Sequence, residues 1–250
     1  MPSSTTNLDR NPLFRKLNSI SVLDADERAA LAALPMMVRE LRPDEVICRE
    51  GDRPSQCCLV LEGFSYRSKL VRDGRRQIFS FHIEGDIPDI QSLHLKMMDH
   101  DLSALSSARV GFIQHQHLRE LCLRNPRIAA ILWRDTLIDG AIFREWMAGI
   151  GRRDAPTKVA HLLCEMYVRL DAVGLAKGGS VPMPITQEEL ADALGLSTVH
   201  VNRSLQAIRQ QGLIHLAQGT LTIPNWAALT AMAEFDPTYL HLDPRAEGEA

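Results

Sequence analysis

Residues 186–214 read TQEELADALGLSTVHVNRSLQAIRQQGLI, and this stretch decides the fold of the C-terminal part of the chain. Thr186, followed three residues later by Glu189, forms the capping-box pattern that begins a helix. Gly195 is expected to end that helix, because a tight turn between helices needs a residue that tolerates a left-handed backbone conformation. Ser197 can then cap a second helix over residues 198–211. The stretch therefore predicts two short helices joined by a tight turn.

The predicted helix pair has small and apolar residues where the two helices must approach each other. Ala191, Gly195 and Val201 follow the spacing of the helix-turn-helix motif, with Ala allowing close approach, Gly making the turn and Val filling the gap. The following segment, GLIHLAQGTLTI, predicts two short strands around Gln218 and Gly219. Helix, turn, helix and hairpin together form a winged helix-turn-helix, which places its second helix in the major groove of DNA.

The outward face of the second helix carries polar and basic side chains and no acidic one, although the whole chain has a net charge of −3. Such a face suits contacts to phosphates and base edges. For His200 an equal alternative is that the side chain is exposed beside the DNA contact and takes no part in it. The side chains that we predict to contact DNA are Thr198, Val199, His200, Asn202, Arg203 and Gln206.

Composition describes an ordinary globular protein: 250 residues, of which 45% are hydrophobic and 24% charged. No apolar run is long enough to span a membrane, and the N-terminal MPSSTTNLDRNPLF lacks the pattern of a secretion signal. The five cysteines follow no disulfide or metal spacing, so we expect them to be small apolar residues in a reducing compartment. The chain is expected to be cytoplasmic, with no membrane partner.

Residues 42–113 consist of short apolar or alternating runs separated by glycines. Strands bounded in this way predict an antiparallel sandwich or barrel. The dipeptide Asp73-Gly74 predicts a hairpin turn, because both residues tolerate positive φ. Before this block, residues 24–34 predict a short helix that Asp24 caps. The glycines that separate the strands are Gly51, Gly63, Gly74 and Gly85.

Residues 125–150 predict a long helix. Asn125 is a good N-cap and Pro126 suits the first helical position, where no backbone N–H is needed. A helix that is apolar over so many turns either crosses the core of its own domain or packs on a second copy of the chain. We predict the second arrangement, with a core helix as the alternative. The predicted dimer interface follows alternating spacings of three and four residues: Ile128, Ile131, Asp135, Ile138, Ile142 and Glu145.

From about residue 13 to residue 226 the chain resembles the Crp/Fnr superfamily of bacterial transcription regulators. ITQEELADALGLSTVHVNRSLQAIRQQGLI resembles the DNA-binding signature of that family, and CLVLEGFSYRSKLVRDGRRQIFSFHIEGD resembles the hairpins of its effector domain. The resemblance implies a homodimer joined along the long helix, a palindromic operator in double-stranded DNA, and RNA polymerase as a partner. Two-fold symmetry would place the half-sites about 34–36 Å apart, centre to centre.

The resemblance also assigns roles at matching positions. Arg203 stands where the family places an arginine on a guanine edge, a contact that discriminates by about 1–3 kcal/mol. Asn202 and His200 are its neighbours in the groove. A glutamate that is frequent in the family falls at Val199, which can contact only a thymine methyl group, and Ser204 replaces a usual apolar residue. The binding mode is therefore expected to carry over, with a non-standard half-site.

Gly85 and Asp86 match the start of the phosphate-binding cassette of the cyclic-nucleotide-binding members, and they are the candidate residues of an effector pocket. The cassette arginine of those members falls near Met98 and Asp99 here. Residues 86–108 contain one lysine and four aspartates, and added carboxylates would repel a phosphate. Cyclic AMP is therefore not expected as the effector, and the identity of any effector stays open.

No cofactor is expected. The chain has no cysteine before Cys48, whereas the family members that carry an iron–sulfur cluster ligate it with N-terminal cysteines. A haem- or metal-dependent sensor remains an alternative, and a metal-dependent β-barrel enzyme is a weaker one, because no compact 2-His-1-carboxylate motif occurs. A regulator gated by a protein, or not gated at all, is a further alternative. The histidines available to a metal are His82, His94, His100, His115 and His117.

These inferences define an α+β fold with an N-terminal antiparallel β-roll of the cyclic-nucleotide-binding type, a long helix and a winged helix-turn-helix. The tail is polar and contains prolines, so it is expected to be disordered. The expected segments are 1–124 for the β-roll with helical flanks, 125–151 for the dimerisation helix, 152–235 for the DNA-binding domain and 236–250 for the tail.

Overall fold

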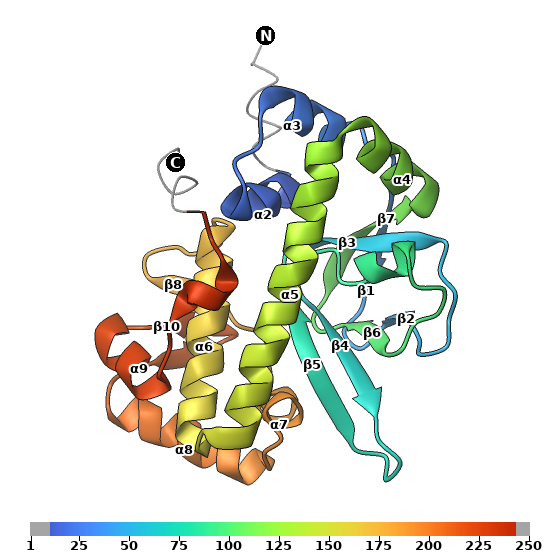
Figure 1. Cartoon of the computed structure of the whole chain (residues 1–250). Helices are drawn as coiled ribbons and strands as arrows, with labels where there is room; N and C mark the ends of the chain where they lie inside the picture. Colours follow the sequence, from blue (N-terminus) through green and yellow to red (C-terminus); the bar gives the residue numbers. More distant parts are fainter. Residues whose placement is uncertain (1–10, 244–250) are drawn as a thin grey trace. The chain divides into compact units, whose positions relative to one another are not determined.

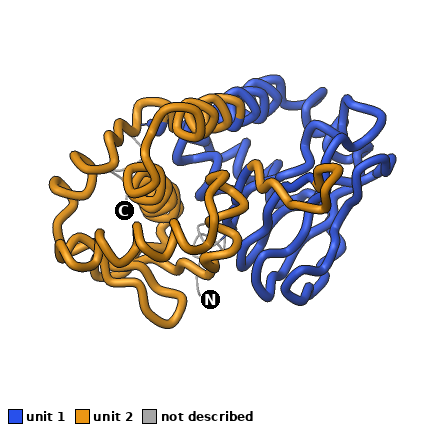
Figure 2. Tube along the Cα trace, turned by 90° about the horizontal axis from the view of Figure 1, so that it is seen from below, with its two compact units in different colours: residues 1–69, 80–139, 242–250 blue, residues 70–79, 140–241 orange. Residues whose placement is uncertain are grey.

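The computed structural model describes residues 11–243 and has the predicted α+β fold (Figure 1). These residues form two compact units (Figure 2). The first unit comprises residues 11–69, 80–139 and 242–243, and the second comprises residues 70–79 and 140–241. In this described range, no helix is both long enough and apolar enough to cross a membrane.

The first unit begins with two short helices, α2 (Pro12–Ile20) and α3 (Ala25–Ala32). Asp24 caps α3 as predicted, and it forms a capping box with Glu27. The Asp24 carboxylate accepts the Glu27 N–H, and the Glu27 carboxylate accepts the Asp24 N–H, each at 2.9 Å. These bonds satisfy donors that the first helical turn leaves without a partner.

Two antiparallel sheets follow, with strand orders β1-β7-β3 and β2-β6-β4-β5. The glycine-bounded runs therefore form the predicted β-sandwich. Buried residues from both sheets share one core, among them Cys58, Leu102 and Phe112. The strands are β1 (Met37–Leu41), β2 (Val46–Cys48), β3 (Gln56–Glu62), β4 (Ser65–Leu70), β5 (Arg76–His82), β6 (Asp101–Ala104) and β7 (Ala108–Gln114).

The turn between β4 and β5 lies where Asp73-Gly74 predicts it. Gly74 has a φ of 82°, and its N–H donates to the Val71 carbonyl at 2.9 Å. A residue with a side chain rarely adopts this conformation, so glycine suits the position. Between β5 and β6 lies a 3₁₀ helix, η1 (Ile90–Leu93).

The long helix α5 (Pro126–Arg152) begins at Pro126 as predicted, and it continues from the first unit into the second. It follows α4 (His115–Arg124). The role predicted for Asn125 is different, however. Its side-chain amide donates to the Leu121 carbonyl at 3.0 Å, so this side chain closes the end of α4.

The prediction that the seam beginning at Ile128 forms a dimer interface is wrong for this face of α5. The four isoleucines are at most 6% exposed in the single chain, so they belong to its own core. Asp135 lies 3.4 Å from the Lys16 ammonium, and Glu145 pairs with Arg153. Apolar periodicity identifies a buried helix face without telling whether the same chain or a second copy covers it. The residues corrected here are Ile128, Ile131, Asp135, Ile138, Ile142 and Glu145.

The second unit packs helices around a small antiparallel sheet of order β8-β10-β9. Strand β8 pairs with β10 through Val181 and Leu221. The elements after α5 are α6 (Ala155–Ala172), β8 (Ser180–Pro182), α7 (Gln187–Leu194), α8 (Thr198–Gln210), β9 (His215–Ala217), β10 (Thr220–Thr222), α9 (Trp226–Ala233) and η2 (Pro237–Leu240).

The tail predicted to be disordered from residue 236 is ordered as far as Asp243. The 3₁₀ helix η2 buries Leu240, and the Tyr239 hydroxyl donates to Glu165 at 2.9 Å. Glu165 also accepts the Trp146 indole N–H at 2.9 Å. The polar segment after residue 236 is thus held by the buried Glu165 carboxylate, an interaction that the composition of the segment does not predict. Residues 244–250 of this prediction lie outside the described residues.

Candidate DNA-binding site

Helix α7 begins at the predicted capping box. The Thr186 N–H donates to the Glu189 carboxylate at 2.6 Å, and the Glu189 N–H donates to the Thr186 hydroxyl at 3.2 Å. The helix ends at Gly195, which adopts a left-handed conformation with φ 63° and ψ 36°. Both ends of α7 are therefore fixed by the residues that the sequence indicates.

The turn after α7 brings the second helix against the first. Ala191 is buried, and its carbonyl accepts the Leu196 N–H at 3.1 Å, across the turn. Val201 is completely buried, as the helix-turn-helix spacing predicts. Ser204, which replaces a usual apolar residue, is also buried. Close packing of small side chains holds α7 and α8 in a fixed relation.

Helix α8 presents one face to the interior and the other to solvent. The Ser197 hydroxyl caps the helix by accepting the His200 N–H at 3.3 Å. Leu205 and Ile208 are buried on the inner face of the helix. The helix contains no acidic residue. Of the predicted contact residues, Asn202 is half-buried and the other five are exposed: Thr198, Val199, His200, Arg203 and Gln206.

Asn202 has a hydrogen-bond partner that the sequence does not predict. Its amide Nδ2 donates to Oε1 of Gln187, the first residue of α7, at 3.0 Å. The two residues are far apart in the sequence, and only the packing of α7 against α8 brings their amides together.

The predicted wing follows α8. Strands β9 and β10 pair antiparallel around Gln218 and Gly219, which have φ values of 50° and 70°. Positive φ at both central residues is the requirement of a two-residue hairpin turn of type I′. Arg209 of α8 donates to the Leu216 carbonyl at 3.2 Å, which ties the helix to the wing.

Residues 70–79 belong by packing to the same unit as the helix-turn-helix. The Arg76 guanidinium donates to the Asp192 carboxylate of α7 at 2.7 Å. The Gln77 amide donates to the Ala193 carbonyl at 3.2 Å. Asp192 is thus neutralised by a cation from outside the helix pair.

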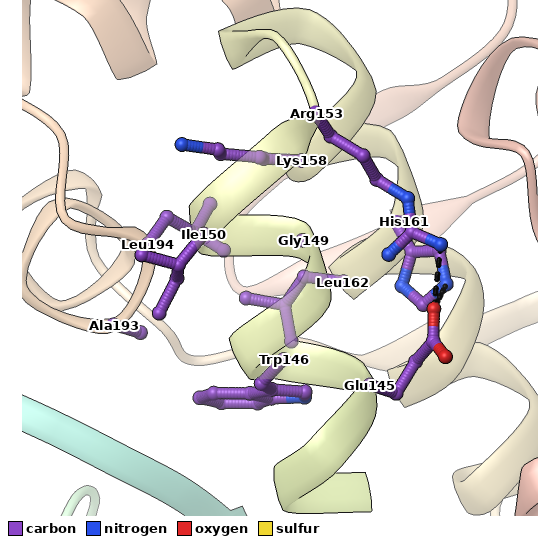
Figure 3. Close-up of a pocket in the computed structure, with 10 residues that line it drawn as sticks. All are labelled: Glu145, Trp146, Gly149, Ile150, Arg153, Lys158, His161, Leu162, Ala193 and Leu194. Atoms are coloured by element: carbon purple, nitrogen blue, oxygen red, sulfur yellow. Dashed lines mark hydrogen bonds and ion pairs between the residues drawn. The ribbon is translucent and has the colours of Figure 1, made fainter.

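A pocket in the second unit lies beside the junction of α5 and α6 (Figure 3). Glu145 accepts a hydrogen bond from Arg153, and the His161 ring nitrogen Nε2 lies 3.3 Å from the same carboxylate. Burial, reinforced by the Arg153 charge, lowers the pKa of His161 to about 4. Within this pocket the Glu145 carboxylate is thus paired with Arg153 and lies close to His161. The other lining residues are Trp146, Gly149, Ile150, Lys158, Leu162, Ala193 and Leu194.

The candidate effector residues Gly85 and Asp86 lie in the first unit, against α2. A Cβ at position 85 would overlap the Pro12 carbonyl, so this glycine is required by a close approach of two backbone segments. The Asp86 carboxylate accepts the Ile83 N–H at 3.0 Å and lies 2.9 Å from the Lys16 ammonium. The Asp86 carboxylate is therefore already engaged in contacts within the protein.

The cassette segment receives an arginine from elsewhere in the chain. Arg67 of β4 donates to the Pro88 carbonyl at 2.7 Å and pairs with Asp139 of α5. Because the Asp139 carboxylate faces this guanidinium, its pKa is lowered even though it is buried. Met98, near the expected place of the cassette arginine, is buried in the apolar core.

Two of the histidines considered as metal ligands, His82 and His115, are buried and hydrogen-bonded within the chain, whereas His94 is exposed. His82 hydrogen-bonds to Ser80 at 2.7 Å, and burial together with the Arg67 charge lowers the pKa of His82 to about 4. His115 begins α4 and bonds to Ser92 at 2.9 Å. Within residues 11–243, no three His, Cys, Asp or Glu side chains are grouped to hold a metal ion.

All five cysteines are free thiols, and all except Cys122 are buried. Burial raises the pKa of Cys48, Cys57 and Cys164 to about 12. A thiol with so high a pKa is a poor nucleophile, in keeping with the expectation that these residues are small apolar ones.

A capped pair of helices, a polar and acid-free outer face on the second helix, and a strand wing define a DNA-binding transcription regulator. Residues 157–232 match the family described as the Crp-like helix-turn-helix domain, and residues 38–125 match the cyclic nucleotide-binding domain. The chain belongs to the Crp/Fnr superfamily. The matched domain models and relatives are those of transcription regulators.

Curated relatives extend over most of the chain. It is 29% identical to the nitrogen fixation regulation protein FixK of Bradyrhizobium diazoefficiens, over 85% of this chain and 88% of that protein. It is 27% identical to the transcriptional activator protein FnrL of Cereibacter sphaeroides, over 77% of this chain and 78% of that protein. The solved structure of FixK2 from Bradyrhizobium japonicum matches with a TM-score of 0.72 and 26% identity, covering 80% of this chain and 98% of that one.

Proposed function

We propose that this regulator acts as a homodimer that binds a palindromic operator, with α8 of each subunit in one major groove and RNA polymerase as its protein partner. The exposed, acid-free outer face of α8 is the observation that carries the proposal. RNA polymerase is proposed because FnrL, a relative over most of the chain, is named a transcriptional activator. Such a regulator works in the cytoplasm, where the chromosome lies.

The base contacts follow from side-chain chemistry. Arg203 is exposed on α8, and its guanidinium can donate two hydrogen bonds to O6 and N7 of a guanine. Val199 is 56% exposed and has no hydrogen-bonding group, so it favours contact with a thymine methyl group. Thr198, His200 and Gln206 complete the exposed face. We therefore propose a half-site that contains a guanine and a thymine in the groove.

The proposed dimer interface lies on the outer side of α5, along residues that we call the outer stripe. These residues follow alternating spacings of three and four, the pattern of a two-helix seam. Trp133, Leu137 and Met147 of the stripe are 69%, 59% and 61% exposed in the single chain. Large apolar side chains this exposed favour coverage by a partner. The outer stripe comprises Ala130, Trp133, Leu137, Gly140, Arg144 and Met147.

Gly140 gives a second argument for the outer stripe. A Cβ there would meet only the Arg144 guanidinium, at 3.4 Å, so the fold of the single chain leaves room for a side chain. A glycine inside a helix costs about 1 kcal/mol relative to alanine. Close approach of a second helix at this point would explain why the cost is tolerated.

Gating by a cyclic nucleotide is not part of the proposal. Residues 86–108 carry four aspartates and one lysine, and Asp86 already pairs with Lys16. Arg67, which enters the cassette from β4, is paired with Asp139. An anionic effector would have to displace these carboxylates, and each displaced carboxylate would be left buried. We propose that DNA binding occurs without cyclic AMP.

The test is selection of random duplex DNA by the purified full-length protein without added ligand, together with sedimentation analysis of its mass. Recovery of a palindrome by a dimer is the expected result. Recovery only after cyclic AMP is added would contradict the ungated part of the proposal. A monomer that selects no motif under either condition would overturn the proposal as a whole.

A further inference from the structure

The amide pair formed by Gln187 and Asn202 is the one direct side-chain bond between the start of α7 and the outer face of α8 in the described chain. Gln187 is exposed and Asn202 is half-buried. The packing of α7 on α8 is accounted for by Ala191, Val201 and Leu205, which are buried between or beneath the helices. Solvent would satisfy both amides equally well, so folding does not explain why they are paired.

The direction of this hydrogen bond determines which groups of the Asn202 amide remain available to a DNA base. An asparagine amide has two N–H donors and one carbonyl acceptor. One N–H of Asn202 is given to Gln187, which leaves the carbonyl oxygen and the other N–H. These two groups form an adjacent acceptor and donor. Adenine presents the complementary donor, N6–H, and acceptor, N7, in the major groove, whereas guanine presents two acceptors there.

Gln187 also fixes the orientation of the Asn202 amide. A solvated asparagine rotates freely about its last torsion and presents its oxygen and nitrogen in either order. In the observed pairing the Gln187 Oε1 atom accepts from the Asn202 nitrogen, which favours this order of the two Asn202 groups. A side chain that is ordered before binding loses less entropy when the base arrives.

We propose that Gln187, which lies outside the recognition helix, is a positioning residue that sets Asn202 to read an adenine in each half-site. This base pair is distinct from the one that Arg203 reads as guanine. The inference rests on the proposed function, because it requires α8 to lie in the major groove.

A phosphate contact is the competing role for Gln187, since side chains at the start of α7 could lie near the DNA backbone. The next residue, Glu188, is exposed and acidic, which disfavours an anion at this place. The two roles differ in what they change. A phosphate contact strengthens binding to every sequence and contributes to the salt dependence, whereas positioning changes the preference at one base pair.

The experiment compares base preferences selected by the full-length wild type, Gln187→Met, Asn202→Ala and the double variant. Methionine keeps the length of glutamine and favours helix, but its thioether is only a weak acceptor in place of the amide oxygen. Glu188→Gln, in the same helical turn, is the matched control. We expect Asn202→Ala to abolish an adenine preference at one position of each half-site. Gln187→Met should weaken the same preference by about 3- to 10-fold, the range that the loss of one net hydrogen bond gives.

The double variant should show no further loss at that position, and every variant should keep the guanine preference assigned to Arg203. That retained preference shows that α8 is folded and docked. Unchanged adenine preference in Gln187→Met, or an equal loss of affinity for all sequences, would overturn the positioning role. A wild type that selects a palindrome without an adenine dependent on Asn202 also overturns it. A wild type that selects no palindrome overturns the proposed function itself.

Discussion

Replacing Arg203 with alanine tests the DNA-binding assignment most directly. The side chain is exposed on α8, and within residues 11–243 it takes part in no ion pair. Its removal therefore leaves no buried charge behind, and alanine is at least as favourable in a helix. We expect the folding stability and the mass of the dimer to stay unchanged.

The expected loss of affinity follows from the number of contacts. One bidentate contact between arginine and guanine discriminates by about 1–3 kcal/mol. A symmetric dimer makes the contact twice, and distant sites add, so the loss is about 2–6 kcal/mol. At about 1.4 kcal/mol for each tenfold change, this corresponds to a loss of roughly 30-fold to 20,000-fold, limited by the remaining non-specific affinity.

The assay is a fluorescence anisotropy titration of the selected operator and of a scrambled duplex at one fixed salt concentration. Arg209→Ala is the control, because Arg209 lies on the same helix but donates to the Leu216 carbonyl of the wing. It should weaken both duplexes similarly. Operator affinity retained in Arg203→Ala, or a guanine preference that survives the substitution, would refute the reasoning.

Three other changes have defined outcomes. Gly195→Ala should cost about 1–2 kcal/mol of unfolding free energy, because φ is 63° and the new Cβ would meet only an Ile150 methyl group at 3.8 Å; a loss above about 4 kcal/mol in urea would indicate a steric clash instead. Burial raises the pKa of Asp89 from 3.8 to about 7, so the folded state holds a proton that the unfolded state has released. The contribution of Asp89 to stability should therefore fall as pH rises from about 4 to 7, whereas His82 and His161, whose pKa values are lowered to about 4, contribute the opposite slope. Over this range the stability of Asp89→Asn should therefore rise more steeply with pH than that of the wild type, as measured by denaturation at each pH. Leu137→Glu should give a monomer by sedimentation, whereas Leu123→Glu, 81% exposed outside the outer stripe, should remain a dimer.

Local chemistry explains why much of the helix-turn-helix could be predicted from its sequence. The capping box of Thr186 and Glu189, the left-handed Gly195 and the cap at Ser197 depend on neighbours within a few residues. Such interactions leave their pattern in the sequence because the chain brings the partners together without tertiary folding. The glycine-bounded strands of the β-roll are explained in the same way.

Long-range packing explains where the predictions made from the sequence are wrong. The seam of α5 that contains Ile131 and Ile138 has the period of a helix interface, but the same chain covers it. The segment after residue 236 is polar, yet the Tyr239 hydroxyl finds the buried Glu165. Each outcome depends on which distant group is within reach.

The ends of the two helices of the DNA-binding motif follow from the amino-acid sequence alone, as does the acid-free face of the second helix. The exposed face of α5 and the amide partner of Asn202 follow from packing between distant segments. The physical reason is the range of the interactions. Caps and turns are satisfied within one or two helical turns, whereas burial and the pairing of Gln187 with Asn202 depend on segments that only the folded chain brings together.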